Sequence, residues 1–262
     1  MSDQSQTACP ACDRPLEQLR YFSRQLLTAE DMTIEQNYFR QKLRRHNRYA
    51  HGWGVMCGFS VEAAQNANQP WQVRICPGYA LAPQGDEILV SCPVLFDLST
   101  GAQTDEPCAP CPCPPLPQPI GDQQRQIVYL AVRFNECNTR PVRVHPSGCA
   151  CDDLACEYSR LRDDFNIAML WQPPACYQKT ITAEQNWIKQ VIAIFSAGAA
   201  DRENFAVPVP ACVCCPEDPW VILATILLPL AMTTPVAPGD ISYKDRRVLL
   251  SESMLWQALL HK

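Results

Sequence analysis

The stretch from Arg20 to Glu62 constrains the fold most, because it predicts a helix that ends at glycines and passes straight into a strand. Thr28 is a suitable helix N-cap, and Asp31, three residues later, completes a short form of the capping box. Gly52 and Gly54 end the predicted helix. Apolar residues at every second position then predict a strand with one buried face: Val55, Cys57, Phe59 and Val61.

Two apolar stripes run along the predicted helix, with a basic ridge between them. At about 100° per residue, the first stripe contains Met32, Phe39, Leu43, His46 and Ala50. The second stripe contains Ile34, Tyr38 and Tyr49, and the ridge contains Arg40, Arg44 and Arg48. We therefore expect the helix to lie between two bodies, with Phe39 buried. The ridge is either a solvated face or a docking edge for carboxylates of this chain or of a neighbouring subunit.

Several motifs within this stretch resemble a known family. They read Leu-Thr-Ala-Glu-Asp (27–31), Glu-Gln-Asn-Tyr (35–38), Arg-Arg-His-Asn-Arg (44–48) and His-Gly-Trp-Gly-Val-Met-Cys-Gly (51–58). Residues 149–163 and 222–248 fit the same pattern, so the resemblance touches most of the chain. The family consists of baseplate-associated or fibre-attachment components of contractile injection systems and phage-tail-like particles. The resemblance implies a structural subunit whose partners are other subunits of the same particle.

Composition limits the class of protein. The chain has 262 residues, of which 47% are hydrophobic and 19% charged, so we expect a sizeable core. A net charge of −5 argues against general nucleic-acid binding. The start lacks a secretion signal, and the most apolar run, from Val221 to Met232, is too short to span a membrane. We therefore expect no direct membrane insertion and a cytoplasmic location within a large assembly, which cell lysis can release.

Sixteen cysteines are the least ordinary feature, and most of them come in clusters. Without a secretion signal, clustered thiols favour metal sites or reduced thiols over a disulfide framework. Metal, disulfides and free thiols all remain open. The candidate structural zinc site consists of Cys137, Cys149, Cys151 and Cys156, with Cys113 as an alternative ligand. A weaker candidate is half a zinc site at Cys9 and Cys12.

The rest of the chain reads mainly as β structure. Short strands are predicted at 71–76, 79–82, 87–91, 126–134, 164–171, 220–228 and 247–250, and the pair 79–82 and 87–91 forms a hairpin. A second helix is expected to open at Thr182, with Trp187, Ile188, Val191, Ile192 and Phe195 facing inward, and a third after Ser251. The predicted fold is α+β, a β-sandwich or small barrel with an N-terminal helix and Cys/Pro-rich loops.

Proline marks the clearest break in the chain, between residues 105 and 121. We predict an N-terminal arm at 1–19, a helix with strands at 20–104, a Pro/Cys-rich excursion or linker at 105–121, and a β-rich part with two helices at 122–262. Proline removes backbone donors, so the excursion cannot be a central strand.

No sequence signature of a catalytic site is present, whether of a hydrolase, a metalloprotease, a nucleotide-binding loop or a dinucleotide-binding fold. We therefore predict a non-enzymatic structural subunit, with structural zinc as the one expected cofactor. The alternative is a stand-alone metal-binding or redox module.

Overall fold

The computed structural model describes residues 15–64, 68–103, 126–143, 156–174, 177–196 and 218–251, together with 253, 254 and 257. The chain divides into two compact units. The first, here called the helical unit, comprises Met1–Gly52, Pro83–Gly85 and Pro173–Pro219. The second, the sheet unit, comprises Trp53–Ala82, Asp86–Gln172 and Trp220–Lys262. Most of the predicted arm at 1–19 and all of the excursion at 105–121 lie outside the described residues.

The helical unit contains α1 (Ala29–His46), a π-helical turn (Asn47–His51) and α2 (Tyr177–Ser196). The predicted cap of α1 is confirmed: Thr28 and Asp31 form a capping box. The predicted start of α2 at Thr182 is wrong, because the helix begins at Tyr177. Tyr177 and Thr180 are both buried, and burial of these side chains outweighs the local capping signal at Thr182.

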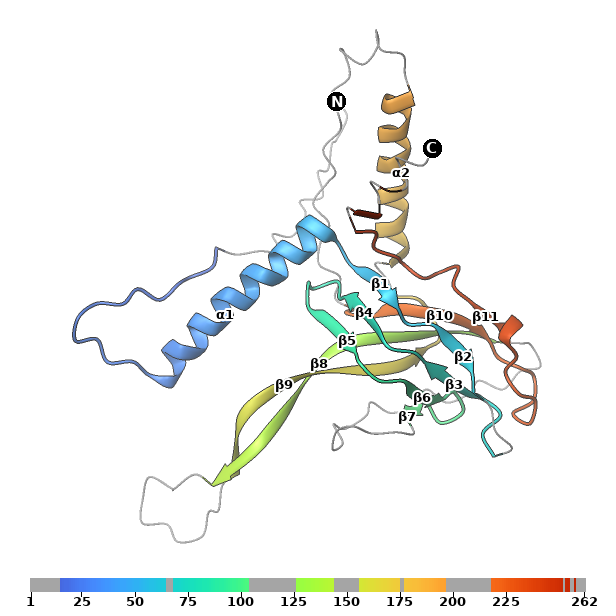
Figure 1. The fold of residues 1–262 in the computed structure, drawn as a ribbon, viewed down its shortest axis with the longest axis horizontal. Coiled ribbons are helices and arrows are strands. Elements are labelled where there is room, and N and C mark those ends of the chain that lie inside the picture. The colour runs from blue at the N-terminus through green and yellow to red at the C-terminus, as the bar shows by residue number, and fades with distance from the viewer. Residues whose placement is uncertain are drawn as a thin grey trace, which may run out of the picture. The chain divides into compact units, whose positions relative to one another are not determined.

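The described strands of the sheet unit form three antiparallel sheets (Figure 1). The first, in the order β1-β4-β5, contains β1 (Gly54–Gly58), β4 (Gly78–Leu81) and β5 (Glu87–Val90). The second, in the order β2-β3-β6-β7, contains β2 (Val61–Ala63), β3 (Gln72–Ile75), β6 (Val94–Asp97) and β7 (Ala102–Gln103). The third, in the order β11-β10-β8-β9, contains β8 (Ile127–Arg143), β9 (Cys156–Leu170), β10 (Val221–Leu227) and β11 (Ile241–Ser242).

Buried apolar side chains from all three sheets form the core of this unit. The largest fully buried ones are Phe59, Phe96, Ile75, Ile88, Leu98, Leu130, Ile222, Leu223 and Ile226. The first sheet lies against the third, since β5 contacts β8 and β9, and β1 contacts β10. The described sheets are open, so the α+β class is confirmed without a closed barrel. Strand β10 is buried along most of its length, as its apolar sequence predicts.

One predicted strand is in fact two. Sequence alternation predicts a single strand from Val55 to Val61, but β1 ends at Gly58 and β2 belongs to another sheet. Gly58 has φ +69, and a Cβ there would lie 2.2 Å from the carbonyl oxygen of Pro77. Phe59 follows with φ 55 and is fully buried. This corner turns the chain between sheets, and it leaves Cys57 exposed instead of in the core.

The hairpin predicted before and after Pro-Gln-Gly-Asp is confirmed as the β4–β5 pair. The predicted strand at 126–134 is present but continues to Arg143, and β9 begins at Cys156. The sequence predicts a loop from Cys137 to Cys156, because this segment contains four cysteines, two prolines and His145, and proline argues against a central strand. Here, however, β8 has only one partner, because β10 pairs with it no further than Val132, and an edge strand tolerates proline.

Two short C-terminal predictions have different outcomes. The strand predicted at 247–250 is reduced to a single parallel bridge between Val55 and Val248. The helical start predicted after Ser251 is supported, since the amide of Met254 donates to the Ser251 hydroxyl over 3.3 Å.

Candidate interaction surfaces

The start of α1 is held by polar contacts. The backbone amide of Thr28 donates to the Asp31 carboxylate over 2.8 Å, and the amide of Asp31 donates to the Thr28 hydroxyl over 3.2 Å. Two hydrogen bonds lower the pKa of Asp31 below its usual range. The larger effect comes from the backbone N–H of Thr28, and the smaller from the Thr28 hydroxyl. Tyr21, in the segment before the helix, donates its hydroxyl hydrogen to Glu35, and this bond raises the pKa of Tyr21.

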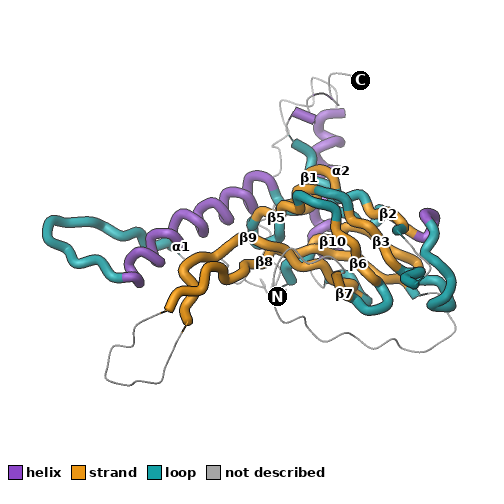
Figure 2. The backbone as a smooth tube through the Cα atoms, turned by 60° about the horizontal axis from the view of Figure 1, so that its bottom comes forward, coloured by secondary structure: helices purple, strands orange, loops and turns teal. Residues whose placement is uncertain are grey.

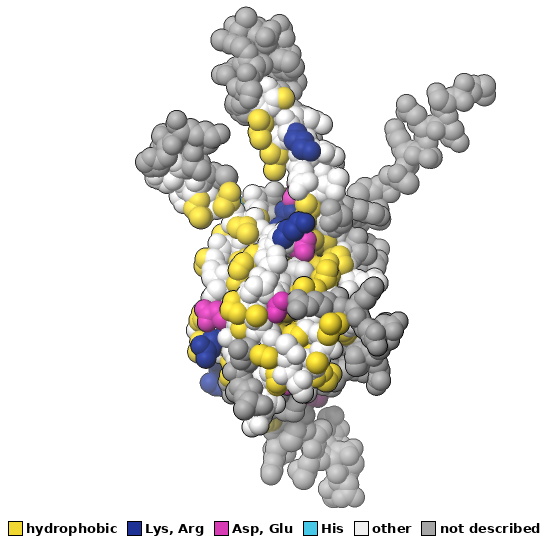
Figure 3. Space-filling view, turned by 90° about the vertical axis from the view of Figure 1, so that its right-hand side faces the viewer, with side chains coloured by type: hydrophobic (Ala, Val, Ile, Leu, Met, Phe, Trp, Pro, Cys, Tyr) yellow, Lys and Arg dark blue, Asp and Glu magenta, His cyan; other side chains and the backbone are white. Residues whose placement is uncertain are grey.

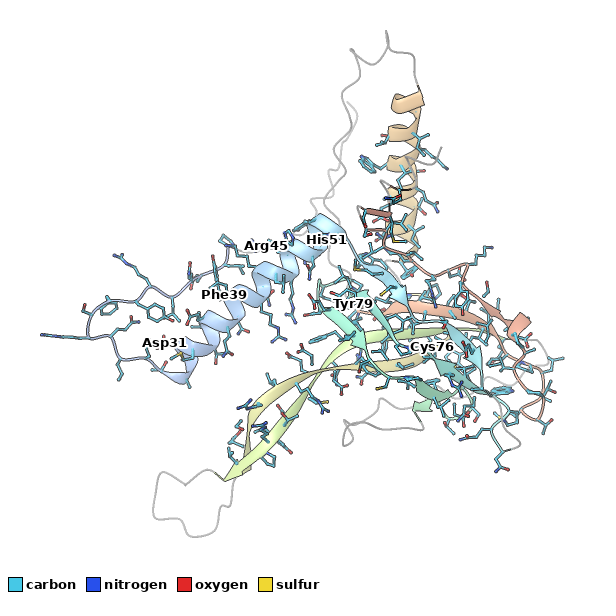
Figure 4. All side chains as sticks on the ribbon, viewed as in Figure 1. Asp31, Phe39, Arg45, His51, Cys76 and Tyr79 are labelled. Carbon is cyan, nitrogen blue, oxygen red and sulfur yellow. The ribbon has the colours of Figure 1, made fainter. Side chains whose placement is uncertain are left out.

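The apolar stripe of α1 is exposed. None of the residues of α1 is buried, and Phe39 is 57% exposed. The expectation that Phe39 lies in a core is therefore wrong for the single chain. Figure 4 shows Phe39 midway along the helix, where its ring meets that of Tyr38 edge to face at 5.3 Å. Other exposed apolar residues of this helix and its π-turn are Met32, Ile34, Leu43 and Tyr49.

The basic ridge lies on the same helix. Arg40, Arg44 and Arg48 are all partly exposed, and each has interactions within the chain. The Arg48 guanidinium lies 4.7 Å from the ring centre of Tyr49. Between residues 40 and 48 the sequence adds Lys42 and Arg45 and contains no carboxylate. The basic character suits the C-terminal end of the helix. Its role as a docking edge stays a prediction.

Asn47 ties the end of this helix to a distant turn. Its side chain is only 6% exposed, and its Nδ2 donates to the Gly85 carbonyl oxygen over 2.9 Å. Gly85 has φ +95, and a Cβ there would lie 2.1 Å from the Arg44 carbonyl oxygen. Sequence reasoning missed this contact. The available signal was an asparagine among basic residues in the last turns, because a buried side-chain amide needs a hydrogen-bond partner.

The motif that ends in Arg246 and Arg247 contacts the motif around Trp53. The Arg247 guanidinium lies 4.6 Å from the ring centre of Trp53 and donates to the Trp53 carbonyl oxygen. The backbone amide of Val55 donates to the Arg247 carbonyl oxygen over 2.9 Å. These residues belong to two of the stretches that carry the family resemblance, and in this fold they hold the first strand in place.

Arg246 and Tyr243 make a second set of such contacts. Arg246 Nε donates to the Leu223 carbonyl oxygen over 2.6 Å, and its Nη2 donates to the Phe59 carbonyl oxygen. The Tyr243 hydroxyl accepts from the amide of Val61 over 2.9 Å and donates to its carbonyl oxygen over 3.0 Å. Both side chains are thus fixed by backbone groups and serve the fold.

The cysteines of the predicted zinc sites are only partly placed. Cys9, Cys12, Cys149 and Cys151 lie outside the described residues. Cys137 is a buried cysteine within β8, and its thiol donates to the Asp164 carboxylate over 2.8 Å. Cys156 pairs with Arg143, six residues beyond Cys137 along β8, which corresponds to about 20 Å. Zinc at Cys149, Cys151 and Cys156 stays a prediction, with Cys137 too far away to be its fourth ligand.

The described part of the chain contains no group of three or more His, Cys, Asp or Glu side chains placed to bind a metal ion. Neither α1, α2 nor any other described helix combines the length and apolar character needed to cross a membrane. Figure 3 shows charges of both signs among apolar side chains on one face of the molecule.

Comparisons with known proteins gave structural similarities only. No protein-family model matches the chain, and no curated protein matches it. A cryo-electron microscopy structure of the type VI secretion system TssK-TssF-TssG baseplate subcomplex matches with a TM-score of 0.34 and 14% identity, covering 62% of this chain and 53% of that chain. A crystal structure of TssK matches with a TM-score of 0.28 and 12% identity, covering 60% of this chain and 34% of that chain. The chain thus spans about half of the first matched chain and a third of the second.

Proposed function

We propose that this protein is a structural subunit of a contractile injection system or phage-tail-like particle, in or near the baseplate. It acts through contacts with other subunits of the same particle. Support comes from the motifs that resemble the family, and from the contacts by which residues of these motifs stabilise the fold. Thr28, Asn47, Trp53 and Arg247 all bind backbone or neighbouring groups of the chain itself.

The observation that carries the proposal is the exposure of α1. A surface helix of a globular protein normally buries one apolar stripe against its own core. Here Met32, Phe39 and Leu43 are each about half exposed, and none of the residues of α1 is buried. Covering such side chains with a partner contributes about 25 cal/mol for each Å² of apolar surface removed from water. This helix therefore suits contact with another subunit.

Co-sedimentation tests the proposal. Native lysate of cells that make the particle is fractionated by size, and the protein is detected in each fraction. We expect it to sediment with a particle in the megadalton range, far above its 29.4 kDa chain mass. Recovery only near the chain mass would contradict the proposal and would instead suit a stand-alone metal-binding or redox module.

A pair of variants then tests the role of α1. Phe39→Ser removes a large exposed ring from the apolar stripe, and Gln41→Ser changes an exposed polar residue on another side of the helix. We expect Phe39→Ser to lower the fraction of protein that sediments with the particle, while Gln41→Ser leaves it unchanged. If both variants sediment like the wild type, α1 is not the contact surface.

Arg44→Glu distinguishes the two interpretations of the basic ridge. A docking edge for carboxylates requires the positive charge, so the variant should lose particle association while its circular dichroism spectrum stays native. Normal association would show that the ridge is a solvated face.

A further inference from the structure

Helix α1 exposes a complete heptad stripe along one side. Figure 2 shows α1 as one continuous helix. Residues spaced alternately by three and four positions lie along one side of a helix. On α1 this spacing selects six residues, all of them exposed, which we call the heptad stripe: Ala29, Met32, Gln36, Phe39, Leu43 and His46. Because most helical stability in proteins comes from packing of an amphipathic face, a helix of 18 residues with none buried gains stability from a partner.

The two halves of α1 carry opposite charges. Residues 29–39 contain three carboxylates and no lysine or arginine, whereas residues 40–46 contain three arginines, one lysine and no carboxylate. Two such helices that run in the same direction would place one basic half beside the other. Two that run in opposite directions place each basic half beside an acidic half. The charge pattern of α1 therefore complements that of a second, antiparallel α1.

An antiparallel pair of α1 helices has a register in which every residue of the heptad stripe meets another. The two-fold axis of this register lies between residues 37 and 38, at the middle of the helix. Met32 of one copy then faces Leu43 of the other, and Gln36 faces Phe39. At each end the small side chain of Ala29 faces His46. The whole length of one α1 is thus covered by the whole length of the second.

A charged pair flanks this core on one edge. Glu35 and Lys42 each precede a residue of the heptad stripe, and in the same register Glu35 of one copy lies opposite Lys42 of the other. Within the chain, the Glu35 carboxylate accepts a hydrogen bond from Tyr21, and the Lys42 ammonium donates to the Tyr38 hydroxyl over 3.4 Å. A carboxylate accepts several hydrogen bonds and an ammonium donates three, so a contact between the copies adds to these bonds.

We propose that two copies of this chain pair through α1 as an antiparallel helix dimer, with the heptad stripe as its core. The same surface of each copy meets the other, so the contact is isologous and closes as a dimer. The inference rests on the proposed function in taking α1 as a contact surface, and it names the occupant of that surface. Helix α2 of a second copy is a poorer occupant, since Glu184 is its single carboxylate and the basic half of α1 carries four cations.

The length and composition of the stripe set the expected strength of the dimer. At 1.5 Å per residue, the 18 residues of α1 span about 27 Å. Met32, Phe39 and Leu43, each about half exposed, supply the apolar area. A polar residue such as Gln36 in the core of a helix pair favours one register at a cost in stability. An interface of this length lies at the small end of the range for specific complexes, so we expect association at micromolar concentrations.

Charge reversal at the flanking pair tests the dimer in purified protein. Glu35→Lys and Lys42→Glu each convert two attractive contacts into two repulsive ones. Sedimentation velocity at about 1–300 µM should show a wild-type dimer of two 29.4 kDa chains, and each single variant should dissociate about tenfold more readily. The double variant exchanges the two charges and should dimerise like the wild type. An equimolar mixture of the single variants should also dimerise, because each lysine then meets a glutamate.

The double variant also distinguishes antiparallel from parallel pairing. In a parallel pair Glu35 would lie opposite Arg40 of the other copy, so exchanging the charges at positions 35 and 42 would not restore association. Recovery of the dimer would show in addition that chains with both substitutions are folded. Glu17→Lys and Lys244→Glu, which reverse exposed charges outside α1, are matched controls and should dimerise like the wild type.

The outcomes separate this inference from the proposed function. The inference is overturned if the wild-type chain stays monomeric over the whole concentration range, if either single variant dimerises normally, or if the double variant stays dissociated. A monomeric chain whose association with the particle is still lowered by Phe39→Ser would overturn this inference alone, since another subunit would then cover α1. A dimer that follows the expected pattern in a chain that never joins a particle would support the inference and contradict the proposed function.

Discussion

The guanidinium of Arg247 lies over the indole ring of Trp53, 4.6 Å from the ring centre, and donates a hydrogen bond to the Trp53 carbonyl oxygen. The two residues are 194 positions apart in the chain. The contact extends along the backbone, because the amide of Leu249 donates to the carbonyl oxygen of Val55 over 2.8 Å. The segment around Arg247 and Leu249 thus holds β1 in place, and the charged side chain of Arg247 stabilises the fold.

Replacing Arg247 by methionine should destabilise the sheet unit. The variant keeps much of the side-chain volume but loses the charged hydrogen bond to Trp53 and the stacking on its ring. Together these interactions contribute about 2 kcal/mol to the free energy of unfolding. Urea unfolding followed by tryptophan fluorescence measures the change. Arg74→Met, at an exposed arginine of β3, is the matched control and should shift the free energy by less than about 0.5 kcal/mol.

Gly54 should tolerate no side chain. It has φ +138, and a Cβ would lie 2.8 Å from the Arg247 carbonyl oxygen, so Gly54→Ala combines backbone strain with a backbone clash. We expect a loss of at least about 2 kcal/mol in the free energy of unfolding. Gly239→Ala is the control, since a Cβ there meets nothing within 4 Å. Equal urea midpoints for the two variants would contradict the geometry of this corner.

The sequence predicts those parts of this fold that depend on interactions between residues close together in the chain. The Thr28 cap and the β4–β5 hairpin depend on residues only a few positions apart, and both are confirmed. The break at Phe59 depends instead on how closely Pro77 approaches Gly58, which no window of sequence contains. Likewise, Pro141 reads as a loop residue until the sheet order shows that β8 has a free edge there.

The candidate surfaces were harder to predict for the same reason. Periodicity locates the stripe that contains Phe39 and Leu43, but it cannot tell a stripe that faces the chain's own core from one that faces a partner. The alternating charges of the outer part of the β8–β9 ladder were hidden as well, because the sequence predicts a cysteine-rich loop from Cys137 to Cys156. Only the register, with Glu136 opposite Asp163, separates the charges into two faces.

Zinc binding is tested by metal analysis of protein purified without chelator. We propose that Cys149, Cys151 and Cys156 bind a structural zinc ion together with a further cysteine, for which Cys113 is the candidate, and we expect about one zinc per chain. Cys151→Ser should lower the zinc content, whereas Cys137→Ser should leave it unchanged because the ladder separates Cys137 from Cys156. Little zinc with oxidised thiols would establish disulfides, and little zinc with reduced thiols would establish free cysteines. Either result contradicts the proposal.

Asn47→Ala should destabilise the end of α1. The substitution leaves the buried Gly85 carbonyl oxygen without the hydrogen bond from Asn47, which contributes about 1–3 kcal/mol to stability. Asn47→Asp should be at least as harmful, because a carboxylate accepts hydrogen bonds and has no N–H to donate to a carbonyl oxygen. Helix content against urea concentration, measured by circular dichroism, reports the effect. Asn37→Ala, at an exposed asparagine of the same helix, is the control.

The cap of α1 should make the helix sensitive to acid. The hydrogen bonds from Thr28 lower the pKa of Asp31 in the folded state, so folding favours the charged carboxylate. The stabilisation is therefore fully present well above about pH 4, near the unfolded pKa of an aspartate, and is lost as the pH falls through the lower folded pKa. Asp31→Asn should lower the thermal midpoint at neutral pH and have little effect once Asp31 is protonated.

Glu30→Gln controls for the helix dipole in this experiment. It removes a neighbouring charge from the first turn and leaves the hydrogen bonds between Thr28 and Asp31 intact. Thermal midpoints of the wild type and both variants, measured by circular dichroism at a series of pH values, separate the two contributions. We expect the difference between Asp31→Asn and the wild type to shrink on acidification by more than the difference for Glu30→Gln. The prediction is contradicted if the thermal midpoint of Asp31→Asn differs from that of the wild type by the same amount at every pH. The negative charge of Asp31 would then add no stability.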